Sequence, residues 1–136
     1  MINVLLVDDH THVRKSLEHL LAATNDIHVM ASVSSGAEAV AFAHAHSPDV
    51  TIMDISMPGM DGIEATRQIN STTRVMMLSA YAEIEYIYRS LAVGARGYIL
   101  KDTAGEELAV AIRTVSTGKH YFSQPIAEIA EKYLPR

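Results

Sequence analysis

The stretch VTIMDISMPGMDG, residues 50 to 62, places an acid between a hydrophobic run and a turn. Residues 50 to 53 are apolar or β-branched without alternation, which is typical of a strand covered on both faces. Asp54 follows directly, and Pro58-Gly59 behind it is a strong turn signal. The stretch therefore predicts a buried strand whose carboxyl end presents a carboxylate beside a turn.

Four other short apolar runs occur along the chain, with longer amphipathic segments between them. Near-continuous hydrophobic strands joined by segments long enough to be helices indicate a parallel sheet with helices on both faces. Right-handed crossovers leave few topologies for such a sheet, and the doubly wound, flavodoxin-like order 2-1-3-4-5 is among the most favoured. We therefore expect an α/β fold with a five-stranded parallel sheet, its strands at residues 2–7, 27–31, 49–53, 74–79 and 97–100.

The intervening segments carry helical periodicity. Val13, Leu17 and Leu21 lie four residues apart, so they share one face of a helix. Similar stripes run through residues 84–91 and 108–115, and shorter helices are expected at 36–46 and 63–69. Each helix has one face to pack on the sheet and one face for solvent.

Composition and charge limit the function classes. The chain has 136 residues, 49% hydrophobic and 20% charged, which suits one compact domain. The net charge of −5 would repel a phosphate backbone, so direct binding of nucleic acid by this piece is not expected. The absence of cysteine excludes disulfides and thiolate metal sites. No segment reads as a signal peptide or a membrane span, and we expect a cytoplasmic location without membrane association.

Chemically useful side chains stand where the predicted strands end. Asp8 and Asp9 follow the first strand, Asp54 the third, Ser79 ends the fourth and Lys101 follows the fifth. Each alone could be a solvated loop residue or a helix cap. Their joint position is more informative, because the carboxyl ends of parallel strands meet at one edge of the sheet, where such folds bind ligands.

Three neighbouring carboxylates require a cation. Each close pair repels by about 4 kcal/mol at 4 Å with an effective dielectric constant of 20. A set of oxygen ligands suits Mg²⁺ better than zinc. Carboxylates, Mg²⁺ and a lysine together indicate phosphoryl transfer, in which an aspartate can itself be the acceptor. Asp54, central in the sheet, is the best candidate for that acceptor.

Four segments resemble the receiver domain of two-component response regulators, the CheY-like family. They are LLVDDH, VTIMDISMPGMDGIEA, VMMLSA and GARGYILKDTAGEELAVAI, and the resemblance runs from Ile2 to about Phe122. The segments KDT and TVSTGKHYFSQP further resemble the NarL/FixJ branch, whose receivers are fused to LuxR-type helix-turn-helix output domains. Many receivers have a proline after a cis bond where this chain has Asp102, and the geometry of the Lys101-Asp102 bond is left open.

The resemblance implies a role for each strand-end residue. Asp54 would accept a phosphoryl group from a sensor histidine kinase. Asp9 and Asp54 would bind Mg²⁺ directly, Asp8 would act through water, and the backbone carbonyl of Ser56 would complete the protein ligands. Lys101 would pair with a phosphoryl oxygen.

The resemblance also implies a switch. Ser79 would move to hold a phosphoryl oxygen, and Tyr98 would turn inward in the active state. Met57, Pro58 and Tyr81 would flank the site, and Ser56 and Tyr81 would border the path of an attacking water. The readout would lie on the face built by residues 83–93, the strand to Leu100 and residues 106–117.

The expected organisation is a receiver domain at residues 1–122 and a helix, or the start of a linker to an absent DNA-binding domain, at residues 123–136. Pro125, Ile126 and Ile129 in the tail favour a helix. The output would be transcription regulation, with a phosphorylation-linked homodimer as a further expectation.

Three alternatives remain at this point. One is a stand-alone, single-domain receiver. Another is an aspartyl-phosphate phosphatase, which VDDHT disfavours because it lacks the D-x-D spacing of that class. The third is a binding module that keeps the fold but ignores phosphate.

Overall fold

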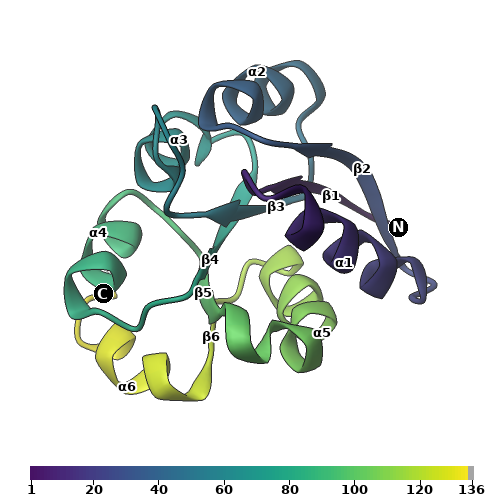
Figure 1. Cartoon of the computed structure of the whole chain (residues 1–136). Coiled ribbons are helices and arrows are strands. Elements are labelled where there is room, and N and C mark those ends of the chain that lie inside the picture. The colour runs from purple at the N-terminus through teal and green to yellow at the C-terminus, as the bar shows by residue number, and fades with distance from the viewer. Residues whose placement is uncertain (135–136) are drawn as a thin grey trace.

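The chain folds around one parallel sheet with helices on both faces (Figure 1). A computed structural model describes residues 1 to 134. The strands lie in the order β2-β1-β3-β4-β5-β6 and pair in parallel throughout. They are β1 (Ile2–Val7), β2 (Ile27–Val33), β3 (Val50–Asp54), β4 (Arg74–Ser79), β5 (Gly97–Leu100) and β6 (Tyr121–Phe122).

The expected α/β class, the parallel sheet and the order of the first five strands are confirmed, but the number of strands was wrong. The sixth strand, β6, pairs with β5 through Gly97 and Tyr121 and through Tyr98 and Phe122. A strand of two residues is too short to produce a hydrophobic pattern, so no periodicity could have revealed it.

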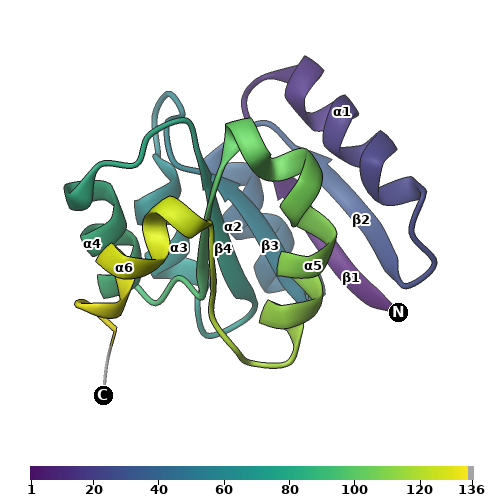
Figure 2. The same cartoon turned by 90° about the horizontal axis from the view of Figure 1, so that it is seen from below.

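The helices divide between the two faces of the sheet. Helices α1 and α5 cover one face, and α2, α3, α4 and α6 cover the other, with α6 beside α4 (Figures 1 and 2). A single 3-10 turn (Lys101–Thr103) joins β5 to α5. The helices are α1 (Thr11–Ala22), α2 (Gly36–His46), α3 (Gly62–Ile69), α4 (Ile84–Ala92), α5 (Ala104–Ser116) and α6 (Gln124–Glu131).

The core consists of two apolar clusters separated by the sheet. Successive strand residues enter opposite clusters, as Leu5 and Leu6 of β1 show. The central strand β3 is buried at every position. This double coverage explains why the strand sequences are continuously apolar rather than alternating.

Helix α6 confirms the helix expected in the tail and packs onto the sheet layer. Ile126 and Ala130 are fully buried in the cluster that contains Tyr98. The division proposed at residue 122 stays a prediction, and positions 135 and 136 of the expected linker lie outside the described residues.

Residues 1 to 134 bear on two expectations from the sequence, the absence of a membrane span and the open geometry of the Lys101-Asp102 bond. None of the helices within that range has the length and apolarity that a bilayer span requires. The same residues contain no cis peptide bond, so the Lys101-Asp102 bond is trans.

Candidate functional site

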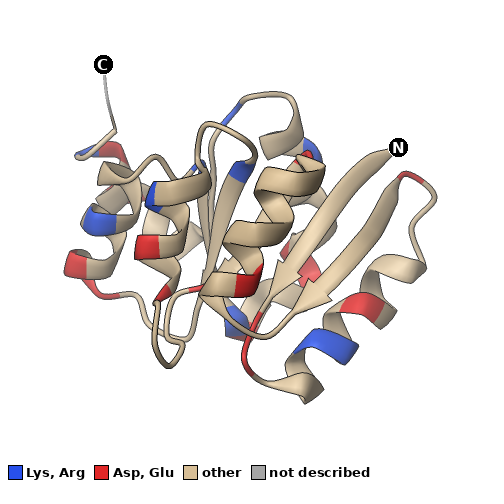
Figure 3. Cartoon of the chain, turned by 90° about the horizontal axis from the view of Figure 1, so that it is seen from above, with Lys and Arg blue, Asp and Glu red and all other residues tan. Residues whose placement is uncertain are grey.

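The predicted acids and the lysine meet at the carboxyl edge of the sheet. Asp8 follows β1 and Asp54 ends β3, and both are almost completely buried, at 1% and 2% exposure. Asp9 is more open, with 24% of its side chain exposed. Acidic and basic parts of the ribbon lie together near the strand ends (Figure 3). The parallel arrangement of β1 and β3 brings these acids together.

Lys101 holds a central position among these carboxylates. Its Nζ lies 3.2 Å from Asp8 Oδ2 and 3.3 Å from Asp54 Oδ1. Burial by itself lowers the pKa of Lys101, but the negative charges of Asp54 and Asp8 outweigh burial and raise it. The side chain is therefore a permanent cation that bridges two strands.

The carboxyl group of Asp54 binds a proton more tightly than an ordinary aspartate does. Burial and, after it, the negative charge of Asp8 raise the pKa of Asp54 to about 6, although Lys101 opposes the change. One lysine thus compensates only part of the negative charge. A strongly perturbed carboxyl group in such a position indicates a functional site.

The acids also offer ligand atoms for a metal ion. Asp8, Asp9, His10 and Asp54 each present one ligand atom, and these atoms lie within 4.8 Å of one another. Asp54 Oδ2 is buried with neither a hydrogen bond nor an ion pair, whereas Asp8 Oδ2 faces Lys101 and Asp9 Oδ1 faces the His10 ring. Buried carboxylate oxygens without a donor are costly, so the donor set fits a hard cation such as Mg²⁺.

The sequence reasoning missed His10 at this site. Its backbone N–H donates to Asp8 Oδ1 at 2.9 Å, and its ring Nδ1 lies 3.1 Å from that oxygen and 3.2 Å from Asp9 Oδ1. The available signal was position, because His10 directly follows Asp9 and precedes the first residue of α1.

A glycine fixes the end of β3 against the start of α3. The Gly62 N–H donates to the Ile55 carbonyl at 2.9 Å. A Cβ atom at Gly62 would lie 2.1 Å from the Asp54 carbonyl oxygen, so no larger residue fits without backbone movement. The close approach of α3 therefore holds the backbone of Asp54 in place.

The loop between β3 and α3 carries the residues expected to flank the site. Ser56 and Pro58 are exposed, whereas Met57 is buried in the apolar cluster under α3. Gly59 has a φ of 75°, the left-handed conformation that glycine adopts without strain. The carbonyl ligand at Ser56 and the flanking roles of Met57 and Pro58 stay predictions.

The predicted switch residues are buried on the neighbouring strands. Ser79 ends β4 and accepts the Tyr81 N–H through its hydroxyl at 3.0 Å. The Tyr98 ring is fully buried, and its hydroxyl donates to the Tyr81 carbonyl at 2.6 Å. Burial raises the pKa of the Tyr98 phenol. Tyr81, which is exposed, thus receives contacts from both residues.

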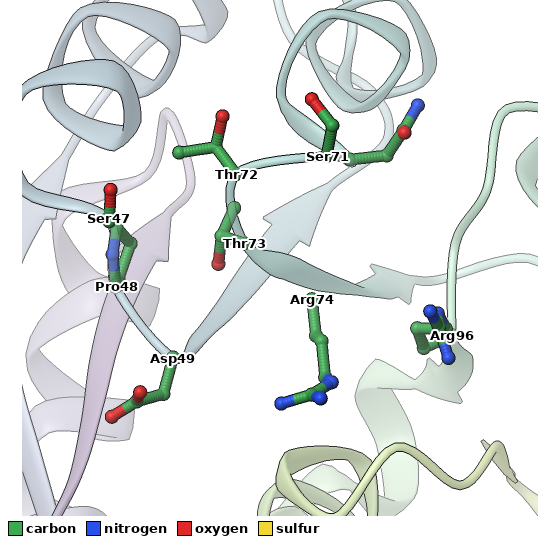
Figure 4. A pocket seen from close by; sticks show the side chains of 9 residues that line it. Ser47, Pro48, Asp49, Ser71, Thr72, Thr73, Arg74 and Arg96 are labelled. Carbon is green, nitrogen blue, oxygen red and sulfur yellow. The ribbon is translucent and has the colours of Figure 1, made fainter.

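A separate polar hollow lies at the opposite edge of the sheet, where β3 and β4 begin (Figure 4). Two of its arginines are already engaged. Arg74 donates to the Ser116 carbonyl at 3.0 Å, and Arg96 donates to the Gly118 carbonyl at 3.2 Å. These bonds satisfy carbonyls at and beyond the end of α5, so both arginines serve to cap that helix.

Comparison with known proteins agrees with the geometry. The family model for the response regulator receiver domain matches residues 4–113. The chain belongs to the response regulator receiver domain family. The predicted resemblance is therefore confirmed.

Two curated relatives are about two fifths identical to this chain over the aligned residues. The response regulator UvrY of Escherichia coli O6:H1 is 40% identical over 131 residues, which cover 94% of this chain and 60% of UvrY. The response regulator protein VraR of Staphylococcus aureus is 41% identical over 128 residues, covering 92% of this chain and 61% of VraR. The receiver domain thus spans about three fifths of the length of these relatives.

A solved structure extends the likeness to the whole fold. A two-component response regulator of the LuxR family from Aurantimonas sp. SI85-9A1 superimposes with a TM-score of 0.89 at 29% identity. The alignment covers 96% of this chain and 95% of that chain. The chain is thus a two-component receiver of the NarL/LuxR type, the branch that KDT and the tail indicated.

Proposed function

We propose that Asp54 is the phosphoacceptor of this receiver and that a sensor histidine kinase supplies the phosphoryl group. The observation that carries the proposal is the pairing of Lys101 with Asp54 and Asp8 beside the buried Asp54 Oδ2, which has neither a hydrogen bond nor an ion pair. The lysine and the carboxylates at the end of β3 are suited to a phosphoryl group, which is dianionic, bound together with Mg²⁺.

Each residue of the site has a separate role in the phosphoryl transfer. An Asp54 carboxylate oxygen attacks phosphorus, a P–O bond forms, and the P–N bond to the kinase histidine breaks, so that the histidine nitrogen keeps the electron pair. Asp9 and Asp54 would hold Mg²⁺ directly, with the Ser56 carbonyl as a third protein ligand and Asp8 acting through water. The metal would neutralise negative charge on the transferring group. Lys101 orients a phosphoryl oxygen.

Ser79 and Tyr98 would report the new charge. The Ser79 hydroxyl is expected to exchange the Tyr81 N–H for a phosphoryl oxygen, and Tyr98 already points inward. The Ser79 change would release the Tyr81 N–H, while Tyr98 holds the Tyr81 carbonyl, so both residues act on the segment that leads into α4. A local electrostatic change would in this way bias a two-state element.

The readout face would be built by α4 and α5 on either side of β5, whose outer edge is paired with β6. Ile84 and Tyr88 on α4 are 56% and 52% exposed, which is unusual for large apolar side chains and is typical of an interaction surface. We propose that this face controls a DNA-binding output domain in the full-length regulator and supports a phosphorylation-linked homodimer. The cytoplasm is the proposed location, and transcription regulation the proposed output.

Phosphorylation can be tested directly. The protein is incubated with acetyl phosphate and Mg²⁺, and its intact mass is measured. We expect a single phosphoryl adduct that disappears in Asp54→Asn and when Mg²⁺ is chelated. Asp49→Asn is the matched control. Asp49 directly precedes β3, at the end of the strand away from the site, so this variant should still form the adduct. The absence of any adduct would contradict the proposal.

A further inference from the structure

The junction between β6 and α6 is bonded to β5 through Ser123, which is 1% exposed. The Ser123 N–H donates to the Tyr98 carbonyl at 3.1 Å, which continues the pairing of the two strands. Its hydroxyl then accepts the Leu100 N–H at 3.1 Å. A side-chain oxygen therefore takes the place that a backbone carbonyl would take if β6 were longer.

Glu107 in the first turn of α5 fixes this hydroxyl. Its Oε2 accepts hydrogen bonds from Ser123 at 2.7 Å and from Thr103 at 2.5 Å, and its Oε1 accepts one from Tyr121 at 3.0 Å. Hydroxyls of three residues, one before α5 and two at the junction of β6 and α6, thus meet on one carboxylate. We call Ser123 and Glu107 the clasp.

Ser123 does not perform the usual task of a serine at its position. It is the residue before α6, yet its side chain caps none of the N–H groups of that helix. Ser35, in the same position before α2, accepts the Glu38 N–H at 3.2 Å. The hydroxyl of Ser123 is instead used to connect α6 with the end of β5.

The two ends of this connection have different neighbours. On one side, Leu100 directly precedes Lys101, whose ammonium group contacts Asp8 and Asp54. On the other side, α6 buries Ile126 in the cluster that contains Tyr98. A change in the position of Lys101 would therefore reach the start of α6 through the bond between the Leu100 N–H and the buried Ser123 hydroxyl.

We propose that Ser123 and Glu107 are positioning residues that couple phosphorylation of Asp54 to the docking of α6; the inference rests on the function proposed above. A phosphoryl group on Asp54 competes with Asp8 for the Lys101 ammonium and so changes the geometry at Leu100. The clasp transfers this change to α6. Because coupling between two sites is reciprocal, docking of α6 also alters the affinity of the site for the phosphoryl group.

The experiment measures hydrogen exchange of the α6 backbone amides with and without beryllofluoride and Mg²⁺, a mimic of the phosphoryl group. In the unaltered protein the exchange rates of these amides should change by about fivefold or more. In Ser123→Ala and in Glu107→Ala, beryllofluoride should still bind, as the fluorine NMR signal of the bound ion reports, but the change at α6 should disappear.

Ser35→Ala is the matched control, since it removes a serine before a helix that is not connected to β5, and it should keep the full response of α6. Bound beryllofluoride without a response of α6 in the unaltered protein would overturn the coupling. The same conclusion would follow if both clasp variants kept the full response. Failure of the unaltered protein to bind beryllofluoride at all would overturn the proposed function, and this inference with it.

Discussion

Asp54 shows how a single residue combines a structural cost with a function. Its carboxyl group is buried beside Asp8, and one lysine only partly compensates the charge. Strand-end positions alone led from the sequence to Asp8, Asp9, Asp54 and Lys101, because topology forces those positions together. The position of His10 directly after Asp9 was a signal of the same kind. The clasp could not be found in this way, since the contacts of Glu107 and Ser123 depend on packing between separate elements.

Replacing Asp54 by asparagine should stabilise the metal-free protein at neutral pH. The folded-state pKa of about 6 lies above the ordinary value of 3.8, so the folded protein binds more protons than the unfolded chain between these values. The free energy of unfolding therefore falls as pH rises through this window. The advantage of Asp54→Asn should be near zero below about pH 4 and reach about 1 to 3 kcal/mol above about pH 6 to 7. Urea unfolding in EDTA at several pH values measures it, and a difference independent of pH would contradict it.

At the scale of elements, helices were easier to predict than the short strand. The expected helix at 36–46 agrees with α2, and the apolar spacing of the tail correctly indicated α6. Strand β6 escaped because its two residues are defined by the partner strand rather than by their own pattern. Its presence explains why α6 begins where it does, next to β5.

Because β3 and α3 are in close contact at Gly62, adding one methyl group there should strongly destabilise the protein. Gly62→Ala would place Cβ against the Asp54 carbonyl, so α3 or the end of β3 must move. We expect a loss of about 3 kcal/mol or more in the free energy of unfolding, together with slower phosphorylation. Gly105→Ala in α5 is the control, because its Cβ would meet no atom within 4 Å and should be neutral or stabilising. Chemical denaturation of both variants gives the comparison, and equal stabilities would show that β3 and α3 separate easily.

At the scale of the whole molecule, Mg²⁺ should act as a stabilising ligand. The folded site brings Asp54 beside Asp8 and Asp9, from which it is distant in the sequence, so the ion binds the folded state preferentially. At 100 times the dissociation constant the gain is about 2.7 kcal/mol. Thermal unfolding in Mg²⁺ and in EDTA should differ by several degrees, and Asp9→Asn should reduce the difference. Identical unfolding temperatures in both buffers would count against a metal at these acids.

The sixth strand also decides how this molecule can associate with others. A strand at an open sheet edge offers a row of free backbone donors and acceptors, to which a strand of a second chain can pair. Without β6, β5 would be such a strand. Two residues of β6 and the Ser123 hydroxyl already occupy those groups along Gly97 to Leu100, and α6 lies beside them. Backbone-mediated addition of a strand is therefore blocked on that flank. Any partner that approaches there must recognise side chains on helices, and such a surface can be altered by a signal without breaking the sheet.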